Sequence, residues 1–394
     1  MPKTSEASQT NFKTNRLSST EASRAKIKEV AFQDVSREHQ AFSEEIRDAF
    51  HLVLASGRML QSAEISQLEN QLAVRCNRRF AVAVGSCTDA LFFALRASEV
   101  QAGDEVLVTD FSFGASATCI RRLGAVPRFV DVDPQTCLMD LHRAAQLLTP
   151  KTTAIVAVHL YGNMIPPMEI VDFARSHRLH LIEDAAQALG AEFDGEPAGS
   201  LGLASCLSFD PTKNLSAPGS GGMVLTDDER VARGIRSLRY HGIDAEGWHR
   251  ELGYNSQMPS LTAAMLLVKL RHFDEMQRLR GEIASEYLQG LRDLPIAIPR
   301  RDEKSRSSWH KFVIRSDRRN DLQAFLLARG ITTKVHYPFA LRRHPLFATT
   351  TDMDYESNSD LCARTVLSLP IFPYLTTAEC AHVVESVREF FNKQ

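Results

Sequence analysis

Between residues 80 and 228 the chain alternates between short apolar runs rich in β-branched residues and segments with helical periodicity. The predicted strands are residues 80–85, 104–110, 126–133, 152–160, 179–185, 204–210 and 221–228. The helices predicted between several of these strands are residues 88–98, 116–124, 140–148 and 166–177. Strands that are apolar on both faces must be covered on both faces, which favours a mainly parallel sheet between helices. The sequence therefore predicts an α/β fold, whose ligands bind beyond the carboxyl ends of the strands.

The segments on either side of this alternation have a different character. Residues 1–28 are polar, with nine Ser or Thr among the first 23, and predict a mobile polar tail. The apolar periodicity of residues 39–56 predicts a helix that ends at Gly57. A long helical stretch at 260–294, with a predicted break near Gly281, leads into further elements. These are a strand at 311–316, a helix at 321–330, a strand at 331–338 and helices at 359–367 and 376–391. We therefore expect a large cofactor-binding α/β domain over residues 29–265 and a smaller C-terminal α/β domain over residues 266–394.

Composition excludes several classes of protein. The 46 Lys and Arg residues nearly balance the 48 Asp and Glu residues, so no overall field would hold nucleic acid or an anionic membrane. No apolar run approaches the roughly 18–20 residues of a membrane helix. The seven cysteines are scattered, without a CxxC pair or zinc spacing. We expect reduced thiols, no metal site, no nucleic-acid or membrane partner and a cytoplasmic location.

Two polar residues follow predicted strands at the edge where a ligand is expected. Asp184 ends the run LHLIED, where a partly buried carboxylate needs a partner; taken alone, it is more simply a helix cap. Lys213 lies on a tight connection after the strand that carries Ser208. Most lysines are surface residues, but one in such a place can lose its charge and form a Schiff base.

A third signal is the junction GSCTDALFFAL at residues 85–95, where a strand turns into a helix. Ser86, Thr88 and the amide of Asp89 either cap this helix or bind a phosphate at its N-terminus. The dinucleotide and P-loop fingerprints GxGxxG and GxxxxGK[ST] are absent. A phosphate cradle, a buried carboxylate and a loop lysine, in this chain order, together fit pyridoxal phosphate.

Several motifs carry a resemblance to a known family. They are GSCTDAL (85–91), GDEVLVTDFSFGASA (103–117), IEDAAQALGA (182–191), SFDPTKNLSAPGSGG (208–222), GYNSQM (253–258) and HYP (336–338). From about residue 30 to the C-terminus the chain resembles the DegT/DnrJ/EryC1/StrS family of pyridoxal-phosphate-dependent sugar aminotransferases. The resemblance implies an aspartate-aminotransferase-like fold (fold type I) and pyridoxal 5'-phosphate as the cofactor.

The resemblance also implies roles for individual residues. Lys213 is implied to bind the cofactor's aldehyde and to transfer the proton during catalysis, and Asp184 to pair with the pyridine nitrogen. Gln187 is implied to lie near the ring and its 3-hydroxyl, and Phe113 to stack on the ring. The residues implied to hold the phosphate are Ser86, Thr88, Asp89 and Ser208.

The implied assembly is a homodimer with shared active sites, in which Asn255 reaches the phosphate of the neighbouring subunit's cofactor. His241, His310, His336 and Tyr337 are candidates for contact with substrate. Structural roles for these four residues are at least as simple a reading of the sequence.

The implied activity is transfer of an amino group from an amino acid, expected to be glutamate, to a nucleotide-linked keto-sugar in amino-sugar biosynthesis. A cyclitol or another cyclic ketone as the acceptor, and a pyridoxal-phosphate-binding regulator without turnover, remain alternatives. A dehydratase of the same family is disfavoured, because those enzymes resemble this chain but carry His where it has Lys213. Cys87, Asp210, Gln257 and Pro259 depart from residues that the family favours at these positions.

Overall fold

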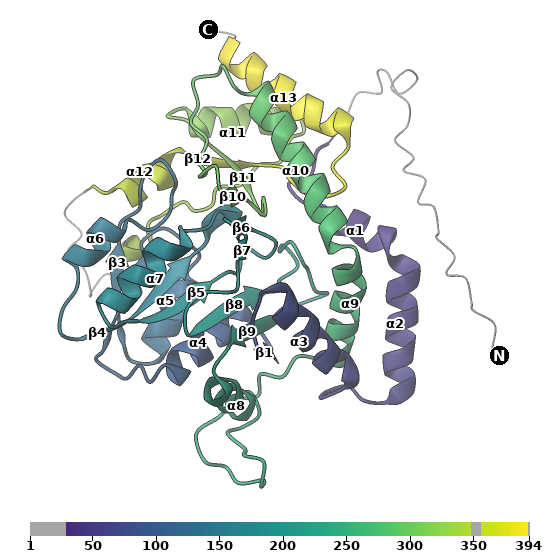
Figure 1. Ribbon diagram of the computed structural model, residues 1–394. Coiled ribbons are helices and arrows are strands. Elements are labelled where there is room, and N and C mark those ends of the chain that lie inside the picture. The colour runs from purple at the N-terminus through teal and green to yellow at the C-terminus, as the bar shows by residue number, and fades with distance from the viewer. Residues whose placement is uncertain (1–28, 348–355, 393–394) are drawn as a thin grey trace.

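The computed structural model describes residues 29–347 and 356–392 (Figure 1). The predicted mobile tail, residues 1–28, lies outside the described residues. Figure 1 shows a central sheet with helices on both sides and a second group of helices above one end of it. None of the helices in the described ranges has the length and apolar character needed to cross a membrane.

A seven-stranded sheet forms the centre of the molecule. Its strands are β1 (Phe80–Val84), β2 (Glu105–Thr109), β3 (Val126–Val130), β4 (Thr152–Val158), β5 (His180–Asp184), β8 (Ala204–Ser208) and β9 (Gly222–Thr226). Their order across the sheet is β1-β9-β8-β5-β4-β2-β3. Only β9 runs antiparallel to its neighbours in this sheet. The predicted mainly parallel α/β sheet is confirmed.

Helices cover both faces of this sheet, as the apolar strands require. One face packs against α4 (Cys87–Ala97), α5 (Ala115–Arg122) and α8 (Glu229–Leu238). The other packs against α3 (Ala63–Arg75), α6 (Leu141–Gln146), α7 (Pro167–Ser176) and α9 (Ser260–Arg271). Alternate residues of one strand serve the two layers: in β1, Val82 and Val84 face the first layer, whereas Ala81 and Ala83 face the second.

Two predicted helices are each divided by a break. Residues 39–56 contain the end of α1 (Val35–Ala41) and all of α2 (Ser43–Ser56), and α2 ends at Gly57 as predicted, with φ 67°. The predicted break near Gly281 is wrong, because Gly281 lies inside α10 (Phe273–Gly290). The chain turns instead at His272, whose ring stacks on that of Phe42 with the centroids 4.4 Å apart. The residues at the two breaks, Phe42 and His272, thus contact each other, and the apolar periodicity of either segment gives no sign of this contact.

The C-terminal part is built on a two-stranded antiparallel sheet of β11 (Phe312–Arg315) and β12 (Val366–Leu369). Around it lie α10, α11 (Arg319–Ala328), α12 (Asn358–Thr365) and α13 (Thr377–Asn392). The predicted strand at 331–338 is wrong: within it only isolated bridges form, between Ile331 and Val30 and between Lys334 and Ser368 of β12. The elements not yet named are β6 (Glu192–Phe193), β7 (Glu196–Pro197), β10 (Ser305–Arg306) and the 3₁₀ turns Leu160–Gly162 and Leu341–Arg343. The predicted domain boundary after residue 265 falls inside α9, and the two-domain division stays a prediction.

The first residue of β9 fixes how closely this strand approaches the start of α4. A Cβ atom at Gly222 would overlap the backbone carbonyl of Ser86 and the amide nitrogen of Cys87. Glycine therefore lets β9 lie against the helix N-terminus that the sequence predicts as a phosphate site.

We expect Gly222→Ala to lower the free energy of unfolding by about 1–3 kcal/mol, because backbone atoms must move to accept the methyl group. Gly219→Ala, on the same connection, is the matched control, since nothing lies within 4 Å of its Cβ position. Urea unfolding of the two variants measures the difference. Equal losses of stability would show that the close approach at Gly222 is unimportant.

Candidate active site

A cavity of about 310 Å³ lies beyond the carboxyl ends of β5 and β8, where the fold class predicts a ligand site. It brings together groups from the sheet, from the starts of α4 and α5, and from the C-terminal part of the chain. The predicted site residues that line it are Ser86, Thr88, Phe113, Asp184, Gln187, Ser208, Lys213, His310, His336 and Tyr337.

Asp184 is the last residue of β5, and its side chain is buried at one wall of the cavity. Its Oδ2 accepts a hydrogen bond of 2.7 Å from the hydroxyl of Ser116, and its Oδ1 accepts one of 3.2 Å from the amide of Ala186. Burial raises the pKa of Asp184, and the bond from Ser116 partly offsets the rise. No cation lies within ion-pair distance of this carboxylate among the described residues. The site therefore holds a desolvated acid that a cationic ligand would stabilise.

Lys213 enters the same cavity from the connection between β8 and β9. Its amide donates to the carbonyl of Asp210 over 2.8 Å, which closes a tight turn just after the strand. Burial lowers the pKa of the Lys213 ammonium, while the charges of Asp184 and Asp210 oppose this shift. Asp210, one of the departures from the family pattern, thus acts on the lysine electrostatically. A lysine whose pKa is lowered has more neutral amine available as a nucleophile.

The start of α4 supplies backbone amides and hydroxyls to the cavity. The Oγ of Ser86 caps the helix by accepting the amide of Asp89 over 3.1 Å, so the capping reading of Ser86 is confirmed and the Asp89 amide is engaged. Thr88 follows within the first turn, where amides have no acceptor inside the helix. Ser208, at the end of β8, lines the cavity with them. The Asp89 side chain is turned elsewhere, accepting from Ser256 at 2.8 Å.

Gln187 connects the sheet side of the cavity to the C-terminal part of the chain. Its Oε1 accepts the amide of Tyr161 at 2.9 Å, and its Nε2 donates to the hydroxyl of Tyr337 at 3.1 Å. The hydroxyl of Tyr161 in turn donates to the carbonyl of His336. Phe113 is 60% exposed at the mouth, with its ring centroid 6.2 Å from that of Tyr337. These contacts hold the predicted ring-facing residues around one opening.

The three histidines predicted to contact substrate divide between two places. His310 is buried, with its Nδ1 3.2 Å from Oδ1 of Asn214, and burial lowers its pKa well below the usual range. His336 has its Nδ1 2.8 Å from Oγ of Ser368, and burial lowers its pKa to about 3. Both line the cavity as neutral rings. His241 does not line it: this residue is exposed, in the segment that follows α8.

Asn255 also lies outside the cavity, exposed near the end of the segment between α8 and α9. The backbone of Asn255 forms an isolated bridge with Tyr240, so the two ends of this segment are held together. Figure 1 shows the segment extending away from the body of the molecule. Its residues are thus placed at the surface of one chain, apart from that chain's own cavity.

Ser116 and Lys311 are among the cavity residues that sequence reasoning missed. Ser116 lies in the motif DFSFGASA, but nothing in the sequence pairs it with Asp184, 68 positions away. Lys311 lines the cavity beside His310, and a single lysine before an apolar strand carries no local signal.

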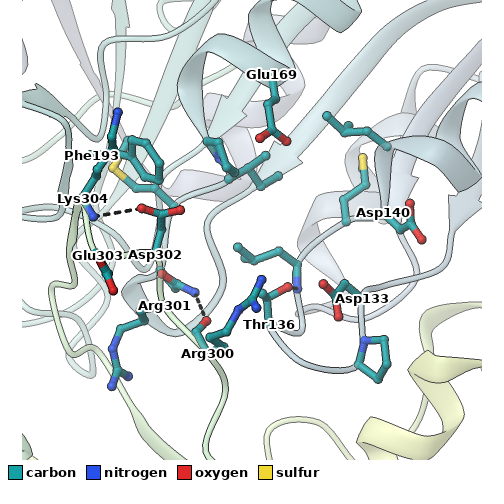
Figure 2. A pocket seen from close by; sticks show the side chains of 18 of the residues that line it. Asp133, Thr136, Asp140, Glu169, Phe193, Arg300, Arg301, Asp302, Glu303 and Lys304 are labelled. Carbon is teal, nitrogen blue, oxygen red and sulfur yellow. Dashed lines mark hydrogen bonds between the residues drawn. The ribbon is translucent and has the colours of Figure 1, made fainter.

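A larger cavity, of about 780 Å³, lies elsewhere and shares no residue with this one (Figure 2). In Figure 2 the acidic side chains of Asp133, Asp140 and Glu169 surround the same hollow as Arg300 and Lys304. The residues that line this larger cavity do not include a lysine and a buried strand-end carboxylate that face each other, as Lys213 and Asp184 do in the smaller cavity. Size alone therefore does not identify the reactive site, and the chemistry of the side chains favours the smaller cavity.

The smaller cavity fits the predicted cofactor. A buried carboxylate without a cationic partner suits a protonated pyridine nitrogen, and a lysine of lowered pKa suits an aldehyde. The helix N-terminus at Thr88 and the hydroxyl of Ser208 suit a phosphate.

We expect Ser116→Ala to destabilise the cofactor-free protein by about 1.5–3 kcal/mol at neutral pH, because the ionised Asp184 loses a hydrogen bond. The folded-state pKa of Asp184 already lies above 3.8, so its ionisation lowers stability as pH rises through that pKa. The variant raises this pKa further, so its extra loss of stability should grow as pH rises from acid to neutral. Urea unfolding over this range checks the trend.

Ser112→Ala is the control for this measurement. The Ser112 hydroxyl is buried and lies 3.3 Å from that of Ser116, but it makes no contact with Asp184. Its loss should depend little on pH. A pH-independent loss in Ser116→Ala would contradict the proposed control of Asp184.

Comparison with known proteins agrees with this chemistry. Residues 40–388 match the model of the DegT/DnrJ/EryC1/StrS aminotransferase family. The chain is 37% identical to a pleiotropic regulatory protein of Geobacillus stearothermophilus, over 92% of this chain and 98% of that protein. It is 36% identical to the dTDP-3-amino-3,4,6-trideoxy-alpha-D-glucose transaminase of Streptomyces venezuelae, over 94% of this chain and 98% of that protein.

A solved structure shows the same fold. The crystal structure of S. venezuelae DesV in complex with a ketimine intermediate superposes with a TM-score of 0.89 at 36% identity, over 92% of this chain and 98% of that one. The family inferred from the sequence motifs is confirmed, and with it the fold type and pyridoxal phosphate as the cofactor. This chain is a member of the DegT/DnrJ/EryC1/StrS aminotransferase family.

Proposed function

We propose that this aminotransferase moves an amino group from an amino acid, expected to be glutamate, to a keto-sugar linked to a nucleotide. The observation that carries the proposal is the meeting of Lys213 and Asp184 in one buried cavity at the carboxyl ends of β5 and β8. The relative named as a dTDP-amino-sugar transaminase supports a nucleotide-linked sugar as the acceptor.

The two reactive residues of the cavity have tasks that follow from their surroundings. Bound pyridoxal phosphate supplies the electron sink that makes a carbon–hydrogen bond next to the amino group acidic. Asp184 holds a proton at the pyridine nitrogen, because its buried carboxylate is stabilised by a cationic neighbour. Lys213 takes a proton from the substrate carbon and returns it, since burial leaves part of its amine neutral.

Further residues position these groups. Gln187 orients its amide toward the cavity through its bonds to Tyr161 and Tyr337, which suits contact with the ring hydroxyl. Phe113, at the mouth, would cover the ring of a bound cofactor and keep water from it. The proposed phosphate site is the start of α4 with Ser208, where Ser86 holds the turn in place.

We further propose a homodimer in the cytoplasm, with active sites shared between subunits. Asn255 and His241 are exposed on a segment that extends from the body of one chain, so a second copy is needed to bring them to a cavity. There Asn255 would donate to the cofactor phosphate and His241 would line the substrate entrance. His310, His336 and Tyr337 line the cavity from their own chain.

A non-catalytic regulator is the second candidate, because one relative at 37% identity is named a regulatory protein. The complete set of Lys213, Asp184 and Gln187 favours turnover, since binding alone does not need a proton-transfer group. A cyclitol acceptor would present a carbocyclic ring without a nucleotide. Assay of the purified protein with glutamate and a panel of nucleotide keto-sugars, read by mass spectrometry, distinguishes these functions.

We expect Lys213→Ala to abolish transamination, with a fall in rate of at least about 10³-fold, because both the covalent link and the proton carrier are lost. After borohydride treatment the wild-type protein should gain the mass of the reduced cofactor, and the variant should not. A reducible adduct that persists in the variant would place the covalent link at another lysine.

We expect Asn255→Ala to lose cofactor on dialysis more readily than wild type, because the proposed contact from the neighbouring subunit is removed. Asn320→Ala, at an exposed asparagine of α11, is the control. Mixed dimers of Asn255→Ala and Lys213→Ala give the sharper result: one of their two sites combines intact copies of both residues. Recovered activity on mixing is expected at limiting cofactor, and its absence would contradict shared sites.

A further inference from the structure

Lys311 is a second lysine of the active-site cavity to which the proposed chemistry gives no task. It immediately precedes β11, and its amide donates to the carbonyl of Tyr161 over 3.3 Å. Its side chain is buried, with 7% of the residue exposed, and it lines the same cavity as Lys213. The Nζ lies 5.1 Å from the centroid of the Phe32 ring.

The ammonium of Lys311 has no hydrogen bond or ion pair within the part of the chain that the structure describes. Lys269, another deeply buried lysine, shows what this fold provides for a structural cation. Its Nζ lies 2.6 Å from Oε1 of Glu38 and donates to the carbonyl and hydroxyl oxygens of Ser216 at 2.8 and 2.7 Å. A buried cation without such partners is unfavourable, so Lys311 is placed for an anion that arrives from outside.

The charges around Lys311 are mostly positive. Burial, followed by the cations of Arg280, Lys213 and Lys334, lowers the pKa of Lys311 well below its usual range. His310 and His336 face it as neutral rings, and the carboxylate of Asp210 acts in the opposite direction. The Oδ1 of Asp210 is already engaged by the amide and hydroxyl of its neighbour Thr212. The wall of the cavity near Lys311 therefore favours a negatively charged group.

We propose that Lys311 binds a carboxylate of the amino donor. The donor must place its amino-bearing carbon beside Lys213, and an α-amino acid carries a carboxylate one bond from that carbon. A cation in the same cavity is within reach of such a group, whereas the diphosphate of a nucleotide-sugar lies a whole ring away from the reacting carbon. The inference rests on the proposed aminotransferase function and adds the site at which its first substrate is recognised.

The direct test is binding of glutarate, which has both carboxylates of glutamate but no amino group and so cannot react. Calorimetric titration of the cofactor-loaded enzyme should give a Kd about 10- to 100-fold higher for Lys311→Met than for wild type. Lys311→Arg should restore most of the affinity, because the charge is kept. The uncharged diamide of glutarate should bind wild type weakly, a comparison that needs no variant.

Lys334→Met is the matched control. Lys334 is exposed, its Nζ lies 5.3 Å from the same Phe32 ring, and it does not line the cavity. Lys334→Met removes one positive charge from the neighbourhood of the cavity but leaves every residue that lines the cavity in place. Glutarate affinity should stay within about twofold of wild type, since an exposed charge contributes little.

The donor half-reaction, followed by the absorbance of the bound cofactor, identifies which carboxylate is held. If Lys311 binds the α-carboxylate, Lys311→Met raises the half-saturating concentration of glutamate and 2-aminobutyrate but not of 4-aminobutyrate. If it binds the distal carboxylate, glutamate and 4-aminobutyrate are affected instead. The second half-reaction, in which a nucleotide keto-sugar takes the amino group, should be unchanged in either case if the sugar ring of the acceptor carries no charge.

Three results would overturn the inference. The first is equal affinity for glutarate in Lys311→Met and wild type, or no binding to wild type. The second is a loss in Lys334→Met as large as that in Lys311→Met. The third is an effect of Lys311→Met confined to a uronic-acid acceptor or to cofactor retention. Lys311→Gln repeats the test should the Met variant fail to fold. If the wild-type protein binds glutarate but transaminates no acceptor, the proposed function is contradicted and the carboxylate site at Lys311 is not.

Discussion

The position of the reactive acid depends on its neighbour in the chain, Glu183, whose carboxylate is the most completely bonded one in the sheet. Successive residues of a strand point to opposite faces, so Asp184 faces the cavity while Glu183 faces the other layer. Glu183 accepts hydrogen bonds from the amides of Gly199 and Leu201, both at 2.8 Å, and from the hydroxyl of Ser205 at 2.6 Å. The connection between β7 and β8, and β8 itself, are thereby tied to the end of β5.

His159 completes this anchor. Its Nδ1 accepts the amide of Ile165 at 3.2 Å, so the proton of the neutral ring lies on Nε2, which donates to Glu183 at 2.9 Å. Burial opposes ionisation of Glu183, yet the bonds from His159, Gly199 and Ser205 bring its pKa below the usual value. Asp184, one residue along, has fewer donors and a raised pKa. Adjacent carboxylates are thus divided into a satisfied structural anion and one left for a ligand.

The sequence predicted those features that depend on neighbouring residues and missed those that depend on contacts between distant parts of the chain. The strands, Asp184 and Lys213 were predicted because a short apolar run that ends in a polar residue has the same meaning in most α/β sheets. The break at His272 was missed because its one distinctive contact, stacking on Phe42, joins residues 230 positions apart in the sequence. The strand predicted at 331–338 failed because this segment meets β12 at a single bridge, Lys334 with Ser368, while Ile331 bridges Val30, 301 positions earlier in the chain. Lys311 was missed because its burial comes from elements far from it in the chain.

The segment before the sheet explains how these distant parts form one site. Val30 bridges Ile331, Phe32 packs beside Lys311 and His336, and the side chain of Gln33 donates to the carbonyl of Pro211 at 3.4 Å. Five residues after Gln33, Glu38 holds Lys269 of α9 and the hydroxyl of Ser216.

The same short stretch therefore touches both sides of the Lys213 connection and the C-terminal wall of the cavity. Loosening it would move Lys213 and Lys311 relative to each other without altering either residue. Residues that do not line the cavity thus join the connection that carries Lys213 to the wall that carries Lys311.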